Sequence, residues 1–227
     1  MFIKVLGSAA GGGFPQWNCN CANCQGLRDG TIQASARTQS SIIVSDNGQE
    51  WVLCNASPDI SQQIAHTPEL NKAGVLRGTH IGGIILTDSQ IDHTTGLLRP
   101  ARRLPHIRCG APRRFMRISP PASRCLPCCG TGTVAWCITP SRRSSLLPLM
   151  PVLICSLPAV PIASNAPPYS PYRDRPLPGH NVALFIENRR NGQTLFYAPG
   201  LGEPDKTILP WLQKSGLSAD RWHRLAG

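Results

Sequence analysis

Residues 84–96 read Ile84-Ile85-Leu86-Thr87-Asp88-Ser89-Gln90-Ile91-Asp92-His93-Thr94-Thr95-Gly96, and this stretch decides the fold. It begins as an apolar run typical of a buried strand and ends in a polar corner. A buried strand that delivers carboxylate, amide and imidazole groups to a loop is how α/β proteins place chemistry at the carboxyl end of a sheet. Asp92 and His93 can place an oxygen and a nitrogen ligand on one metal ion. The spacing leaves a second interpretation open, in which Asp88 or Asp92 caps the following helix and His93 is an incidental surface residue.

The basic charge of the chain is concentrated in one segment. The formal net charge of +11 would by itself favour a nucleic-acid partner or an anionic surface. Residues 99–164, however, contain ten of the 23 Lys and Arg residues and no Asp or Glu, which leaves 13 basic and 12 acidic residues elsewhere. We therefore expect no nucleic-acid partner.

The length of 227 residues allows one sizeable core or two small domains. No apolar run approaches the length of a membrane span. The start of the chain, residues 1–7, is too short and too strand-like for a secretory signal. We expect a cytoplasmic protein without a membrane span.

Three cysteines lie close together after a glycine-rich turn at residues 7–13. Cys19, Cys21 and Cys24 fall within six residues of one another, in a chain that shows no secretory signal. This arrangement favours a metal over a disulfide, because short loops let three thiolates converge on one tetrahedral zinc ion. We predict a structural zinc site, with a fourth ligand from elsewhere; incidental buried thiols are the alternative. The glycine turn lacks a phosphate-binding pattern, so we expect it to bring backbone close to a pocket or a neighbouring strand.

Other apolar runs predict strands on both sides of the basic segment. Polar corners follow two of these runs, at Asn55 and at Pro199-Gly200-Leu201. Asp59 precedes a predicted helix that runs through Ile64, and capping of that helix is favoured over a role in a pocket. A second helix is predicted over Asp205–Leu212, and no final strand is expected after Gly216. The predicted strands are Phe2–Leu6, Thr38–Asp46, Trp51–Asn55, Asn181–Glu187 and Gln193–Tyr197.

The segment 99–164 differs from the rest of the chain. It holds eleven Pro and six of the ten Cys residues, and shows no sustained period before Leu146. A second metal cluster at Cys125, Cys128 and Cys129 is disfavoured, because no acidic residue or His lies nearby.

We interpret this segment as a shifted reading frame of the same gene, lost near Leu98 and restored near Asn165. A further shift near Ser215 would explain the tail 215–227. We expect the segment 99–164 to be irregular, with few contacts to the flanking sheet. The competing interpretation is a genuine basic, Pro-rich insertion that binds an anionic partner.

Six blocks of the sequence together resemble the metallo-β-lactamase superfamily, and within it a family of proteins of pyrroloquinoline quinone (PQQ) biosynthesis. The resemblance covers residues 1–98 and about 165–214. It implies an α/β fold, the metallo-β-lactamase-like αββα sandwich, built from 1–98 and continued by 165–214. The blocks are Val5–Cys19, Arg37–Ile42, Asn55–Asp59, Asp88–Leu98, Ala166–Pro171 and Leu195–Gly202.

The superfamily motif His-x-His-x-Asp-His falls on residues 88–93. Asp88 and Gln90 replace the two leading His residues, whereas Asp92 and His93 remain. The resemblance therefore argues against two-metal hydrolysis. A single ion held by His and carboxylate is the ligand set of non-haem iron that activates O₂.

The resemblance implies an iron-dependent oxidation of a small peptide-derived, tyrosine-containing PQQ precursor. It places Asp88, Gln90, Asp92 and His93 in the catalytic site, with Asn55 and Asp59 lining it. Other PQQ biosynthesis proteins are expected partners. The alternative is a carrier that takes part in transport of PQQ or its precursor to the periplasm.

The family continues beyond the part that matches Lys214. The resemblance thus implies a truncated chain, whose active-site metal has too few ligands and whose zinc cluster lacks the fourth. We expect its activity to be impaired.

Overall fold

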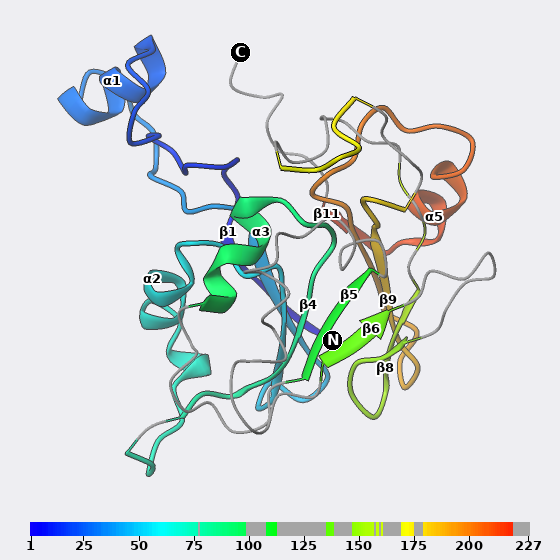
Figure 1. Cartoon of the computed structure of the whole chain (residues 1–227). Coiled ribbons are helices and arrows are strands. Elements are labelled where there is room, and N and C mark those ends of the chain that lie inside the picture. Colours follow the sequence, from blue (N-terminus) through cyan, green and yellow to red (C-terminus); the bar gives the residue numbers. More distant parts are fainter. Residues whose placement is uncertain are drawn as a thin grey trace.

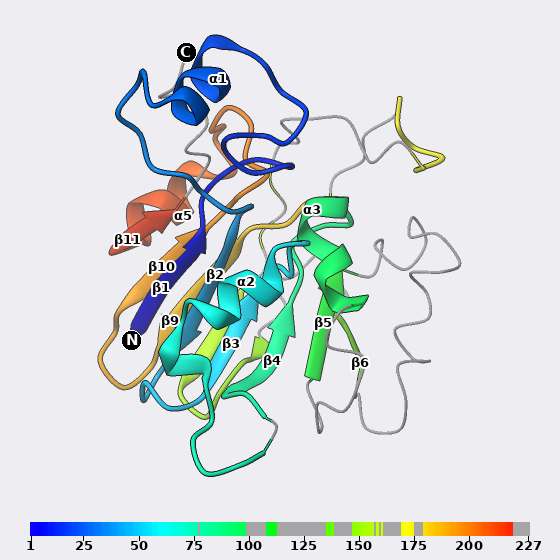
Figure 2. The same ribbon diagram turned by 90° about the vertical axis from the view of Figure 1, so that its left-hand side faces the viewer.

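A computed structural model describes residues 1–76, 78–98, 108–112, 135–138, 147–156, 158, 160, 169–174 and 179–219. Two β-sheets pack face to face, and helices cover their outer faces (Figure 1, Figure 2). The expected αββα class is confirmed. In the described ranges, no helix is both long and apolar enough to cross a membrane.

The first sheet has the strand order β1-β2-β3-β4-β5-β6. The first three strands pair antiparallel, and β3, β4, β5 and β6 pair parallel. The predicted N-terminal strands are confirmed. The strands are β1 (Phe2–Gly7), β2 (Ser41–Ser45), β3 (Trp51–Cys54), β4 (Ile81–Ile85), β5 (Arg108–Pro112) and β6 (Ala135–Ile138).

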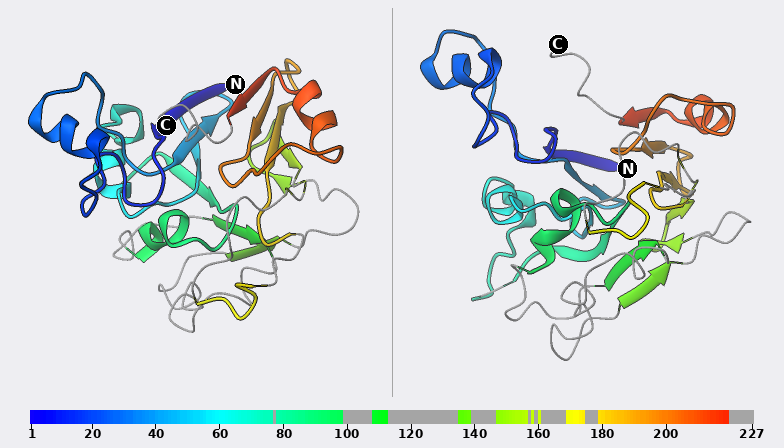
Figure 3. Two further views of the ribbon diagram at one scale, coloured as in Figure 1. Left: turned by 90° about the horizontal axis from the view of Figure 1, so that it is seen from above. Right: turned by 45° about the horizontal axis from the view of Figure 1, so that its top comes forward.

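The second sheet has the order β11-β10-β9-β8-β7. Its centre is formed by β9 and β10, which pair antiparallel and lie at the two predicted strands Asn181–Glu187 and Gln193–Tyr197. Figure 3 shows the two sheets facing each other. The strands are β7 (Leu147–Pro148), β8 (Leu153–Ser156), β9 (Leu184–Asn188), β10 (Thr194–Tyr197) and β11 (Leu217–Ala219).

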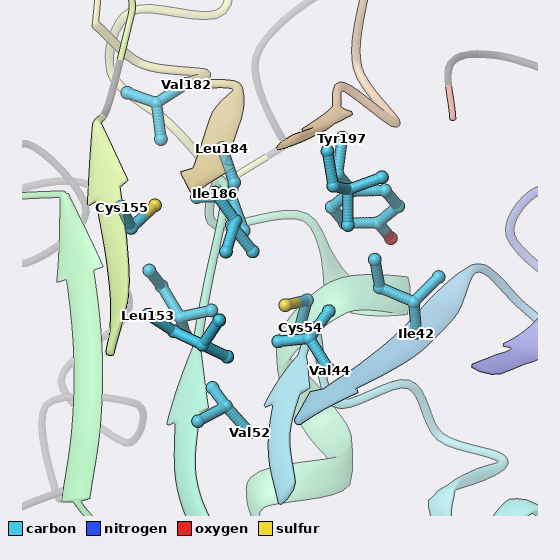
Figure 4. Packing of buried hydrophobic residues seen from close by; sticks show 12 residues of the cluster. Ile42, Val44, Val52, Cys54, Leu153, Cys155, Val182, Leu184, Ile186 and Tyr197 are labelled. Carbon is cyan, nitrogen blue, oxygen red and sulfur yellow. The ribbon is translucent and has the colours of Figure 1, made fainter. Parts of the chain in front are cut away.

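The main core lies between the sheets and follows the two-residue period of strands. Ile42 and Val44 of β2 point into it, whereas Ile43 lies on the other face. Both faces of the first sheet are apolar, because each face packs against another part of the protein. Figure 4 shows residues of β8 and β9, among them Leu153 and Leu184, facing residues of β2 and β3.

Two smaller cores lie beneath the helices. Helix α2 (Ile60–Ala65) and the 3₁₀ turn η1 (Pro68–Leu70) cover the first sheet through Ile60 and Leu70, which are almost fully buried. Helix α5 (Leu209–Lys214) covers the second sheet, where Trp211 lies against Phe185 with 5.1 Å between ring centroids. Helix α5 begins later than predicted, because Asp205 accepts hydrogen bonds from the backbone of Thr207 and Ile208 and forms a turn first.

Two expectations about the unusual segments are wrong where the structure describes them. Strands β5 to β8 belong to the segment 99–164, yet they pair with one another and with β4 and β9. The tail contains β11, which pairs parallel with β10. Strands this short carry too few residues for a period to show, and their pairing depends on distant strands. Most of the rest of the segment, including Cys125, Cys128 and Cys129, lies outside the described residues. The shifted frame stays a prediction.

Strand β8 offers a direct test of whether the basic segment contributes to the core. Leu153 is fully buried between the sheets, whereas Ile154 is half-buried and pairs with the exposed Glu187. We expect Leu153→Ala to lower the free energy of unfolding by about 3 kcal/mol, and Ile154→Ala to lower it by about 1 kcal/mol. Urea unfolding followed by circular dichroism measures both. Equal, small losses would show that β8 adds little to the core.

Candidate active site and cysteine cluster

The candidate site lies where two parallel strands end together. Strand β3 runs into Asn55, and β4 runs through Leu86 into Thr87 and Asp88. The Asn55 N–H donates to the carbonyl of Ile85 at 2.9 Å, and the Thr87 N–H donates to Asn55 Oδ1 at 3.0 Å. The two polar corners are therefore joined directly at the carboxyl edge of the sheet, as predicted.

Asp88 and His93 form a buried pair at this edge. Asp88 Oδ1 lies 2.7 Å from His93 Nδ1, and the two residues are 2% and 6% exposed. Asp88 also accepts the backbone N–H of Gln90 at 2.9 Å and the Thr87 hydroxyl at 3.2 Å. The interpretation of His93 as an incidental surface residue is wrong, because the imidazole is enclosed and held by a carboxylate.

Asp92 lies on the other side of the imidazole. Its Oδ2 is 3.9 Å from His93 Nε2, and its side chain is 25% exposed. Helix α3 (Ile91–Thr94) begins after Gln90 and has no side-chain cap, so neither Asp88 nor Asp92 caps it. With Nδ1 occupied by Asp88, Nε2 and the Asp92 carboxylate are the two atoms available to share a ligand.

The buried pair shifts the pKa values of both partners. Burial favours the neutral form of each group, but the opposite charge and the hydrogen bond between them outweigh it. The pKa of His93 is raised to about 9, and the pKa of Asp88 is lowered. The pair is therefore ionised at neutral pH when no metal is bound.

Two loops approach the site through glycine backbone. A Cβ atom on Gly11 would lie 3.3 Å from Asp92 Oδ2. A Cβ atom on Gly200 would lie 3.1 Å from Asn181 Nδ2 and 3.7 Å from Asp88 Oδ2. The glycine turn and the loop at 199–201 thus both reach the site, in agreement with the expected close approach of backbone.

Asn55 and Asp59 have different roles. Asn55 is fully buried, adopts a left-handed backbone with φ of 65°, and bonds to Thr87. Asp59 occupies the first position before α2 but makes no capping bond, so the capping prediction is wrong. Its Oδ2 instead accepts the backbone and side-chain N–H groups of Gln39 at 2.9 and 3.0 Å. Gln39 Oε1 in turn accepts the N–H of Gly12 at 2.9 Å, so Asp59 holds the glycine turn rather than contacting Asp88 directly.

Sequence reasoning missed two tyrosines near the site. The Tyr169 hydroxyl donates to the carbonyl of Ser89, and the Tyr197 hydroxyl lies 3.1 Å from Ser40 Oγ. Burial raises the pKa of both phenols, so both are neutral at physiological pH. Tyr169 lies in the extended Pro-rich block of the family resemblance, which was the signal available. Tyr197 looked like an ordinary strand residue.

The cysteine cluster lies apart from this site. The sulfur atoms of Cys19, Cys21 and Cys24 all lie within 4.8 Å of one another, at the start of helix α1 (Ala22–Asp29). This helix stands away from both sheets (Figure 1, Figure 3). Arg28 ties the loop together, because its guanidinium donates to the carbonyls of Cys19 and Gln16. Hydrogen bonds from the Cys24 backbone and from Cys19 lower the pKa of Cys21 to about 7, which favours its thiolate.

Comparison with known proteins assigns the family. The sequence model of the beta-lactamase superfamily domain matches residues 50–219. Coenzyme PQQ synthesis protein B of Klebsiella pneumoniae is 72% identical over 222 residues, which cover 95% of this chain and 70% of that protein. The chain belongs to the coenzyme PQQ synthesis protein B family. Its function therefore lies in PQQ biosynthesis.

Further members of the family agree. The Acinetobacter baylyi protein of the same name is 57% identical over 95% of this chain and 71% of its own length. A crystal structure of Zn²⁺-bound PqqB from Methylobacterium extorquens superimposes with a TM-score of 0.85 at 30% identity. That match covers 97% of this chain and 72% of the other, so the two proteins share the fold over the matched part.

The Asp88–His93 pair should make the stability of the metal-free protein depend on pH. The pKa of His93 is raised above its unfolded value of about 6.5, so its contribution is present below that pH and is lost as the pH rises through about 9. The pKa of Asp88 is lowered, so its contribution is present above about pH 3.9 and is lost as the pH falls through its folded value. The stability difference between wild type and Asp88→Asn should be largest between about pH 4 and 6.5.

Urea unfolding in the presence of a chelator, repeated from pH 4 to 10, measures this difference. Asp92→Asn is the matched control, because Asp92 is more exposed and lies 3.9 Å from the imidazole. A difference for Asp88→Asn that stays constant up to pH 10 would contradict the assignment of the pair.

Proposed function

We propose that the chain carries the metal-binding part of an enzyme that oxidises a tyrosine-containing PQQ precursor. The observation that carries the proposal is the placement of Asp92 and His93 at the carboxyl end of β4, with Asp88 behind the imidazole. His93 Nε2 and Asp92 Oδ2 would hold the ion. Their separation of 3.9 Å is wider than the roughly 3 Å between adjacent ligands whose bonds to one ion are about 2.0–2.1 Å long, so the Asp92 carboxylate would move toward His93 Nε2 on binding.

Asp88 acts as a positioning residue in this proposal. By accepting the proton of His93 Nδ1 it fixes the tautomer and leaves Nε2 for a metal, as outer-shell carboxylates do in other metal sites. Thr87 and the backbone of Gln90 hold Asp88 in turn. The residue that replaces the first His of the superfamily motif thus supports a ligand instead of being one.

The donor set supports one ion rather than two. Gln90 stands where the second His of the motif would be, and an amide is a weaker ligand than an imidazole. The loop Pro199-Gly200-Leu201 has no carboxylate. A second metal would therefore lack its ligands among these residues, which argues against hydrolysis.

The nature of the ligands favours iron for the active site. A single ion held by His and carboxylate, when it is Fe(II), supplies activation of O₂. The protein's own contribution is to enclose His93, to fix Asp88 with three hydrogen-bonded groups, and to bring Gly11 and Gly200 close enough to narrow the site. Asn55 secures the same corner through Thr87. We infer that the substrate is a small peptide-derived precursor, and that other proteins of the pathway deliver or receive it.

For the cysteine cluster we propose a structural zinc ion. Cys19, Cys21 and Cys24 offer three convergent sulfurs, and the low pKa of Cys21 favours the thiolate that zinc requires. The crystal structure of the Methylobacterium extorquens relative is of a Zn²⁺-bound protein. Arg28 would act on the zinc only indirectly, by holding the loop carbonyls.

Zinc binding is tested by metal content. Cys21→Ser should lose most of the bound zinc, because two remaining thiolates hold the ion far more weakly than three. Asn23→Ala is the matched control, since Asn23 is exposed on the same turn of helix and offers no thiolate. Elemental analysis after dialysis gives the zinc per chain. Equal zinc in wild type and Cys21→Ser would overturn the site.

Iron binding and turnover test the active site. His93→Ala should abolish Fe(II) binding, and Asp88→Asn should weaken it about 10- to 100-fold, as loss of an outer-shell partner does. His80→Ala is the control, because His80 lies at the opposite end of β4. The measurements are iron content after anaerobic loading and O₂ uptake with a tyrosine-containing precursor peptide, both repeated in the Klebsiella relative.

Two outcomes would contradict the proposal. Unchanged iron binding in His93→Ala would remove His93 from the site. Tight binding of the precursor without O₂ uptake, in the relative as well as in this chain, would favour the carrier instead.

A further inference from the structure

Strand β1 is an edge strand with one free side. In the part of the chain that the structure describes, β1 pairs with β2 and has no second neighbour. The free side of an edge strand presents backbone N–H and C=O groups that another extended chain can pair with. Val5, in the middle of β1, is 57% exposed, so the edge also has an accessible apolar side chain.

A groove runs along this strand on its helix-covered side. It has a volume of about 400 Å³ and lies between residues 4–8, the segment 36–38 and the end of α2 with the residues that follow it. Thr38 closes one side, because its hydroxyl donates to the carbonyl of Leu6 at 2.8 Å. The groove is thus a built feature of β1 and its neighbours, and it lies outside the cluster of Asp88, Asp92 and His93.

The charged residues that line the groove are all positive. Its described lining includes the cations Lys4 and Arg37 and contains no Asp or Glu. Lys4 is already paired, since its ammonium lies 2.7 Å from Glu69, just outside the lining. The guanidinium of Arg37 lies 5.1 Å from the centre of the Phe14 ring, and it has no carboxylate partner within the described residues. Arg37 is therefore the cation most available to a ligand.

His66 adds a second ligand-facing group. Its Nδ1 lies 2.9 Å from the carbonyl of Gln62, so this nitrogen carries the proton and donates it. Nε2 is the nitrogen left for the groove. An arginine fork beside an open strand edge suits an extended chain that carries carboxylates on alternate residues, while His66 Nε2 is left to accept a hydrogen bond.

We propose that β1 is a docking site for an extended acidic peptide segment, which adds to the first sheet as a further strand. Its backbone pairs with the free edge of β1. Every second side chain then points into the groove, where Arg37 binds its carboxylates. The site is separate from the proposed oxidation and does not depend on a bound metal.

Fluorescence anisotropy with labelled peptides tests the proposal on the full chain. The probe is a ten-residue peptide of alternating Glu and Thr, and the control probe has Gln in place of Glu. We expect the acidic peptide to bind, and the neutral peptide to bind at least tenfold more weakly. Arg37→Gln should weaken the acidic peptide about tenfold, the loss of one charge-assisted hydrogen bond. Lys72→Gln, which removes an exposed charge outside the groove, should have no effect.

Backbone pairing is tested separately, with two acidic peptides that are N-methylated on either the odd or the even residues. Only one set of amides can face β1, so one methylated peptide should lose binding and the other should keep it. Equal binding of the acidic and neutral peptides, or no effect of Arg37→Gln, would overturn the role of the groove. Equal binding of both methylated peptides would overturn strand addition. A dimer on size-exclusion chromatography that the peptide does not dissociate would assign the edge to a second copy of the chain instead.

Discussion

The apolar layer between the two sheets is the constraint on which the rest of the structure depends. It joins side chains of β2, β3 and β4 to those of β8, β9 and β10, so each sheet buries the inner face of the other. Because the two sheets are held in this way, the ends of β4 and β10 are brought to the same place. The loop at Gly200 reaches Asp88 only through this packing. The candidate site is therefore a consequence of the core and not of any local motif alone.

The buried Asp88–His93 pair lies at the edge of this core, where the apolar residues of β4 give way to polar ones. Removing two charged groups from water costs several kcal/mol each, and attraction between them offsets the cost only when their remaining hydrogen-bonding capacity is also satisfied. Here Thr87 and the N–H of Gln90 satisfy Asp88. Such a pair is a weak source of stability, which suits a role in orienting an imidazole better than a role in holding the fold together.

The sequence predicted those strands that can be recognised from the pattern of their own residues. The predicted strands Thr38–Asp46 and Trp51–Asn55 and the run from Ile84 to Asp88 have recognisable residue patterns of their own, and all lie where they were expected. Strands β8 and β11 were not predicted, because they are short and are defined by the partners they pair with. At the site, the sequence located Asp88, Asp92 and His93, but the direction of Asp59 depends on Gln39, twenty residues earlier in the chain, and on tertiary packing. The apolar residues of β8 also show that a Pro-rich composition does not prevent a segment from entering a core.

The segment that carries the cysteines lies between Phe14 and Arg37, which pair with each other at its base. Phe14 and Arg37 exchange backbone hydrogen bonds at 2.8 and 2.7 Å, and the bridge between Ala9 and Gln39 lies just below them. The intervening loop and α1 are thereby closed at their base, so they form a small unit whose contacts are mostly its own. Such a unit can open and reclose as a separate cooperative element while the sheets stay intact. With the proposed zinc ion bound, its amide hydrogens would then exchange with solvent at a rate set by that ion, independently of the exchange in the two-sheet core.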